Sequence, residues 1–121
     1  MSDRERLREE FIAARGFWPS ALDGLLDLDP GFFEAYLAFS GHPWTDGVLE
    51  PKVKELVYIA FDASATHLYV PGLKLHIENA LGLGATVDEI MEVLEIASVI
   101  GIHTCTMGVP IVIEELARAG R

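Results

Sequence analysis

The sequence predicts an all-α protein, and three observations support this prediction. Apolar residues recur at steps of three and four along most of the chain, as on one face of a helix. Signals for a helix start precede several of these stretches, and no segment shows sustained alternation of apolar and polar residues. Half of the 121 residues are apolar and 23% are charged, so we expect one domain over residues 1–121 with a substantial core.

In the first part of the chain, the expected helices are separated by recognisable end signals. Gly16 ends a charge-rich first helix. Asp29 followed by Pro30 is an N-cap carboxylate with proline at the first helical position, and it starts an aromatic-rich helix that should end near Gly41. We expect His42 to be a solvated loop residue. The expected helices cover residues 2–14, 20–26 and 30–41, and the expected loop covers residues 42–47.

The next helix begins at Glu50-Pro51 and carries two different stripes. Glu55, Tyr58 and Asp62 form a polar stripe at steps of three and four, so these side chains lie along one side of the helix. For Glu55 the interpretations are a solvated helix carboxylate or a functional group. The other stripe is apolar or small and comprises Val53, Leu56, Val57, Ala60, Phe61 and Ser64.

A histidine within an apolar stripe is the main oddity of the sequence. Pro71 suits the first turn of the helix that contains it, and Gly84 suits a left-handed cap after its end. A buried His76 needs partners for both ring nitrogens. It is either a hydrogen-bonded core histidine or a functional group whose charge changes near neutral pH. The stripe comprises Leu73, His76, Ile77, Ala80 and Leu81.

The last part of the chain contains a long stretch without charge. Thr86 and Glu89 form a capping box for the next helix, which we expect to be kinked or broken between Gly101 and Gly108 before Pro110 restarts a final helix. No Asp, Glu, Lys or Arg occurs over residues 96–113, which predicts a buried core or subunit-contact segment rather than a membrane span. The residues of the preceding helix expected to face inward are Val87, Ile90, Met91, Leu94 and Ala97.

Charge and cysteine content exclude several classes of function. A formal net charge of −10 argues against binding to nucleic acids or anionic membranes, which requires clusters of Lys and Arg. The single cysteine, Cys105, rules out an intrachain disulfide framework and fits a reducing compartment. The N-terminus is charged and lacks the apolar run of a signal peptide. We therefore expect a cytoplasmic protein.

Over about residues 20–118, the sequence resembles the carboxymuconolactone decarboxylase family, which shares its fold with the AhpD-type alkylhydroperoxidases. The resemblance implies an AhpD-like helical domain that assembles into a ring-shaped homo-oligomer, commonly a trimer or hexamer. The peroxidase branch carries a Cys-x-x-Cys pair before the histidine, whereas residues 69–72 here contain no cysteine, which excludes peroxide reduction by that dithiol. The link from Glu55 to His76 is also longer than in the family. The residues that carry the resemblance are Pro51–Leu56, His76 with Ala80 and Leu81, and Gly84–Leu94.

The resemblance implies a decarboxylase or related lyase acting on a small unsaturated lactone or carboxylic acid from the degradation of aromatic compounds. Such a reaction needs a stabilised dienolate and a proton donor, but no metal or organic cofactor. His76 is the candidate proton donor, and Glu55 is the candidate that orients it. The candidate substrate-binding residues are His67, Tyr69, Tyr58, His103 and Cys105.

Blander interpretations stand beside each of these assignments. His67 and Tyr69 can also be ordinary loop residues without a function, and His103 also fits a buried interface. Cys105 also fits an inert core thiol. A metal enzyme that uses His67, His76 and His103 is a third possibility, although no recognised ligand pair is present. The remaining alternative is a non-catalytic binding or assembly protein with the same fold. We expect a small-molecule substrate and self-association, and neither a nucleic acid nor a membrane partner.

Overall fold

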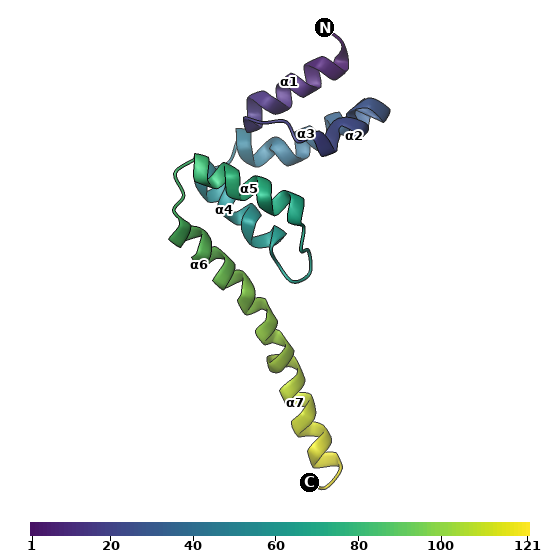
Figure 1. Ribbon diagram of the computed structural model, residues 1–121. Coiled ribbons are helices and arrows are strands. Elements are labelled where there is room, and N and C mark those ends of the chain that lie inside the picture. The colour runs from purple at the N-terminus through teal and green to yellow at the C-terminus, as the bar shows by residue number, and fades with distance from the viewer. The chain divides into compact units, whose positions relative to one another are not determined.

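Every regular element in the computed structural model, which describes residues 1–121, is a helix (Figure 1). The predicted all-α class is therefore confirmed, whereas the ring-shaped assembly remains a prediction. The chain forms two compact units, Met1–Leu49 and Glu50–Arg121, and the single domain also remains a prediction. The elements are α1 (Asp3–Arg15), η1 (Ser20–Leu22), α2 (Asp23–Leu28), α3 (Pro30–Thr45), α4 (Pro51–Asp62), α5 (Val70–Gly82), α6 (Val87–Ser98), η2 (Val99–Ile102) and α7 (His103–Arg118), where η marks a 3-10 turn.

Aromatic packing forms the core of the first unit, in which α1 and α2 both contact α3. The ring of Phe11 meets that of Trp18 edge-on, with 5.4 Å between the ring centroids, and Phe33 is fully buried. Edge-on pairs of this kind add to the free energy gained by burying apolar area. Not every aromatic residue of α3 joins this core, because Phe32 and Phe39 of the same helix are largely exposed.

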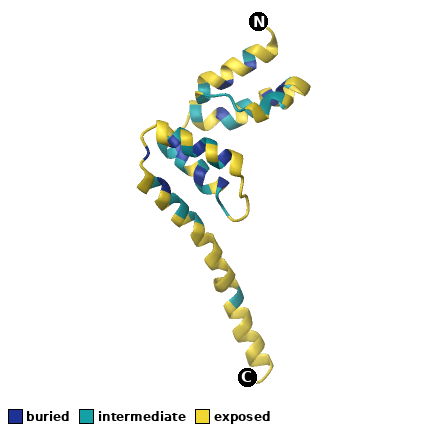
Figure 2. Ribbon diagram, in the orientation of Figure 1, coloured by how far each residue is buried: buried dark blue, intermediate teal, exposed yellow.

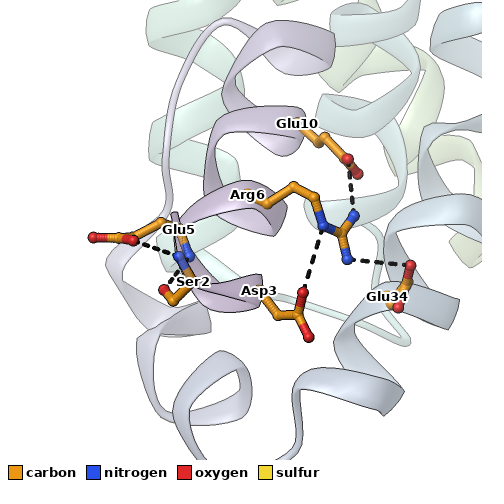
Figure 3. Close-up of polar contacts among 6 residues, drawn as sticks. All are labelled: Ser2, Asp3, Glu5, Arg6, Glu10 and Glu34. Carbon is orange, nitrogen blue, oxygen red and sulfur yellow. Dashed lines mark hydrogen bonds and ion pairs between the residues drawn. The ribbon is translucent and has the colours of Figure 1, made fainter.

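Polar contacts fix the start of α1 and connect it to α3 (Figure 3). Ser2 and Glu5 form a capping box, and the hydrogen bond from the Ser2 backbone lowers the pKa of the Glu5 carboxyl. Arg6 donates to Glu10 at 2.9 Å and lies 3.5 Å from Glu34 of α3. These exposed pairs orient the helices but contribute little free energy individually.

The predicted end of α3 near Gly41 is wrong, because the helix continues through Pro43 to Thr45. Proline at position 43 cannot donate a backbone hydrogen bond, and only two residues of the helix follow it. The Thr45 hydroxyl lies 3.4 Å from the Gly41 carbonyl and 3.3 Å from the His42 carbonyl and donates to both, which satisfies groups at this helix end. His42 is exposed as predicted, but it lies in this last turn rather than in a loop.

In the second unit, α4 packs against both α5 and α6. The predicted helix starts are confirmed, because Pro51 opens α4 and Thr86 with Glu89 forms the capping box of α6. The Thr86 backbone, and then the Lys52 ammonium, hold the pKa of Glu89 below its ordinary value. Gly84 adopts the expected left-handed conformation, with φ of 92°. The buried apolar residues of this unit are Ile59, Ala80, Ala85 and Ile90.

The predicted inward faces of this unit are only partly right. On α4 the polar residues Glu55 and Asp62 are buried beside Ile59, whereas Val57 and Phe61 are 49% and 44% exposed. The physical reason is that α5 packs on the side of α4 that carries the polar stripe. Three further residues predicted to face inward are also exposed, namely Leu81, Val87 and Met91.

The helix α7 has no cover within the chain. Pro110 lies inside it and does not start a new helix, and η2 joins it to α6 as one helical run. No residue of α7 is buried (Figure 2). The run Val87–Arg118 is long and apolar enough to cross a membrane, and none of its most apolar window is buried. The predicted burial of residues 96–113 in the chain's own core is therefore wrong, and a subunit contact remains a prediction.

Replacing Gly72 by Ala should destabilise the second unit. A Cβ at this buried position would lie well inside van der Waals contact with the Asp62 carboxylate and 2.7 Å from the Tyr69 ring. Overpacking of this kind costs about 1–3 kcal/mol. Urea denaturation should show this loss for Gly72→Ala. The control is Gly82→Ala on the same helix, where an added Cβ would have no atom within 4 Å, and this variant should be at least as stable as wild type. Equal stability of the two variants would contradict the prediction.

Candidate active site

A buried imidazole–carboxylate pair lies where α4 and α5 pack together. Nδ1 of His76 lies 2.5 Å from Oε2 of Glu55, and the two residues are 7% and 2% exposed. The other oxygen of Glu55 accepts a long hydrogen bond of 3.5 Å from the Asn79 amide. Because a carboxylate can only accept, Nδ1 carries the proton of this bond, and Nε2 remains free for chemistry. The structure thus brings together the two residues predicted to be catalytic, and their role remains a prediction.

Tyr58 holds the plane of this imidazole. Its ring stacks on that of His76 with 4.4 Å between the centroids and 9° between the planes. The ring of Phe61 also meets that of the same tyrosine edge-on, with 5.0 Å between the centroids. With one face of the imidazole covered and Nδ1 bonded, the direction of Nε2 is defined. Tyr58, predicted to bind substrate, therefore contacts the candidate proton donor itself.

Asp62 belongs to the site and was given no role by the sequence analysis. This carboxylate is 3% exposed. Its Oδ1 lies 3.2 Å from Nε2 of His67, and its Oδ2 lies 3.8 Å from Nε2 of His76. The only signal was its membership of the polar stripe with Glu55 and Tyr58, since one stripe on a helix meets one partner surface.

The link between α4 and α5 folds back onto Asp62. The Tyr69 backbone N–H donates to the Asp62 carbonyl at 2.8 Å, and the preceding Leu68 has a positive φ of 48°. The rings of His67 and Tyr69 lie 5.6 Å apart, and both residues are exposed. Two of the predicted substrate-binding residues therefore lie beside the buried pair, on its solvent side.

The other two predicted substrate-binding residues do not join this cluster within the chain. His103 and Cys105 are exposed on α7, which continues from η2 and is not packed on α4 or α5. The side-chain neighbour of His103 is Thr106, at 3.4 Å. The interpretation of Cys105 as a core thiol is wrong, because the helix that carries it has no cover.

A grouping of side chains suited to a metal ion is not found. No three His, Cys, Asp or Glu side chains are arranged to hold one. Of the three histidines considered as ligands, His67 and His76 share Asp62, whereas His103 lies on the exposed α7. The chemistry that the arrangement offers is proton transfer at Nε2 of His76.

Comparison with known proteins identifies the family of this chain. The model of the carboxymuconolactone decarboxylase family matches residues 30–102, more than half of the chain. The chain belongs to this family. A solved structure of a candidate gamma-carboxymuconolactone decarboxylase subunit from Burkholderia xenovorans LB400 is 57% identical, with a TM-score of 0.94 over 98% of this chain. The match covers 48% of that structure's chain, so this chain spans about half its length. No match is found among curated proteins.

Removing the carboxylate of the buried pair should destabilise the protein strongly. Glu55→Ala leaves His76 buried without its closest partner, and breaking a buried ion pair costs about 3–5 kcal/mol. Glu78→Ala, on the exposed side of α5, should change the free energy of unfolding by less than about 0.5 kcal/mol. Chemical denaturation measures both values. A Glu55→Ala variant as stable as the control would show that the pair contributes nothing to the fold.

Proposed function

We propose that the chain is part of a cofactor-independent decarboxylase that acts on a small unsaturated lactone or carboxylic acid, with His76 as proton donor. The observation that carries this proposal is the buried contact of 2.5 Å between Glu55 and Nδ1 of His76. It leaves Nε2 as the nitrogen for proton transfer. Membership of the carboxymuconolactone decarboxylase family supports the reaction type.

In the proposed reaction, the bond between a ring carbon and the substrate carboxylate breaks, and carbon dioxide leaves. The bonding electrons pass through the conjugated system to the lactone oxygen and form a dienolate. Nε2 of His76 then gives its proton to carbon, and the electrons of the dienolate return to form the new C–H bond. Glu55 keeps the imidazole oriented and stabilises its positive charge before the transfer.

Loss of the imidazole should reduce turnover without unfolding the protein. In a screen of lactones and acids from aromatic-compound degradation, the His76→Gln variant should lose about 10²–10⁴-fold in rate, as expected for a missing general acid. The matched control is His42→Gln, which changes an exposed histidine in the other unit. Release of carbon dioxide is the measurement, and circular dichroism checks the fold. Full activity of folded His76→Gln would refute the assignment, and absence of turnover with every compound would favour a non-catalytic binding protein.

We also propose that a second copy of this chain covers α7 and that the assembly is a cytoplasmic ring, as a trimer or hexamer. The exposed apolar surface of α7 supports self-association, since a patch of this kind is costly in water. In the similar solved structure, the matched part is about half of the chain, and the remaining half is about as long as one further copy of the present chain. The residues of this surface include Met107, Val109, Ile111, Val112, Ile113 and Leu116.

Charge on the surface of α7 should prevent assembly. A variant with both Met107→Glu and Ile111→Glu places two carboxylates one helical turn apart on this helix, and it should sediment as a monomer at micromolar concentration. Leu28→Glu, at a residue that is 89% exposed on α2, is the control and should behave like wild type. Analytical ultracentrifugation distinguishes the two. A monomeric wild type, or recovery of wild type only from membranes, would contradict the proposed soluble assembly.

A further inference from the structure

Asp62 is a buried carboxylate to which the proposed proton donation assigns no task. It is 3% exposed and lies between two imidazoles, 3.2 Å from Nε2 of His67 and 3.8 Å from Nε2 of His76. A buried carboxylate is costly unless it is paired. Its two histidine neighbours are therefore its partners, and only His76 takes part in the proposed proton donation.

Of these three side chains, only that of His67 is open to solvent. The side chain of His67 is 52% exposed, whereas those of Asp62 and His76 are 4% and 9% exposed. His67 can therefore exchange protons with water directly. The nitrogen of His76 that faces Asp62 is Nε2, the one that Glu55 leaves free. His67 and Asp62 thus lead from solvent to the nitrogen that the proposed reaction uses.

The backbone builds this arrangement. The His67 N–H donates to the Ser64 carbonyl at 3.0 Å, and the Tyr69 N–H donates to the Asp62 carbonyl at 2.8 Å. On the other side of Asp62, only a glycine at position 72 leaves space for the carboxylate. The turn that returns His67 to Asp62 is therefore fixed by main-chain contacts on both of its sides.

We propose that His67 and Asp62 form a proton relay that reloads Nε2 of His76 from solvent, an inference that rests on the proposed function. After His76 has given its proton to carbon, Nε2 is unprotonated. Asp62 takes the Nε2 proton of a charged His67 on Oδ1 and becomes a neutral carboxylic acid. Rotation of this carboxyl group about the Cβ–Cγ bond presents the same proton to Nε2 of His76, and its transfer leaves Asp62 a carboxylate again. His67 regains its proton from water. Each turnover thus consumes one solvent proton, which balances the replacement of the carboxylate by hydrogen.

The 3.8 Å separation suits such a relay. It is longer than a hydrogen bond, so Nε2 remains available to a substrate and does not stay bound to Asp62. It also needs a movement of only about 1 Å to reach hydrogen-bond distance. Water has poor access to this nitrogen because Tyr58 covers one face of the ring and the side chain is 9% exposed. His67 and Asp62 act through His76 and need no contact with substrate.

The relay can be tested without a substrate. In protein labelled with ¹⁵N-histidine, NMR measures the exchange of the His76 ring protons with water. The His67→Ala variant should slow this exchange about tenfold or more, in line with the loss of an acid–base group. If His67 served only as a cover, its removal would expose His76 and make exchange faster. The matched control is His42→Ala, which removes an exposed histidine 3.5 Å from Asp46 and should leave the exchange at His76 unchanged.

The outcomes separate the relay from the proposed function. Slower exchange of the His76 ring protons in His67→Ala would support the relay if added imidazole restores the exchange rate and the restored rate levels off as the imidazole concentration rises. Unchanged or faster exchange would overturn it, even if His76→Gln abolished turnover. If slower exchange accompanied a fully active His76→Gln variant, the relay would stand and the proposed proton donor would be wrong. Asp62→Asn is the second variant and should slow exchange without rescue by imidazole, because its amide cannot pass a proton between the two rings.

Discussion

The second unit depends on burying the Glu55 carboxylate against the imidazole of His76. A carboxylate that is 2% exposed must be paired, and its partner comes from a different helix, so this contact of 2.5 Å constrains the approach of α4 to α5 together with the buried apolar cluster. The close packing then demands a residue without a Cβ at Gly72, where the start of α5 passes Asp62. The stacking of Tyr58 on the imidazole follows from the same approach. Polar pairing and packing therefore specify the same geometry in this unit.

The pairing explains which part of the site could be predicted from sequence. An imidazole within an apolar stripe indicates burial, and burial requires a partner, so His76 was identifiable, as was the polar stripe that carries Glu55. The side on which α4 is buried was not identifiable. Hydrophobicity alone places Val57 and Phe61 inside, yet they are about half exposed, and Asp62 is inside instead. The role of Asp62 depends on the turn after α4, which periodicity does not describe.

The helix ends show a similar division between local and tertiary information. Caps and first-turn prolines are local signals, and those at Pro30, Pro51 and Thr86 were predicted correctly. Pro43 and Pro110 carry the same residue type inside helices, where neighbouring turns accommodate the missing N–H. Burial of α7 was predicted because residues 96–113 carry no charge. The apolar composition favours burial, but composition does not say whether another part of the chain packs against this helix, and none buries it.

In the proposed reaction, the charges of the site would connect substrate binding with proton supply. Two buried carboxylates, Glu55 and Asp62, would repel an anionic substrate, and the imidazoles of His67 and His76 are the groups that contact them. When both imidazoles are protonated, the four charges cancel, and an anion approaching Nε2 meets the positive ring directly. When His76 has lost its proton, the negative charge of the pair is uncompensated. In the proposed reaction, the state of the site that favours an anion is thus also the state that holds the proton to be donated.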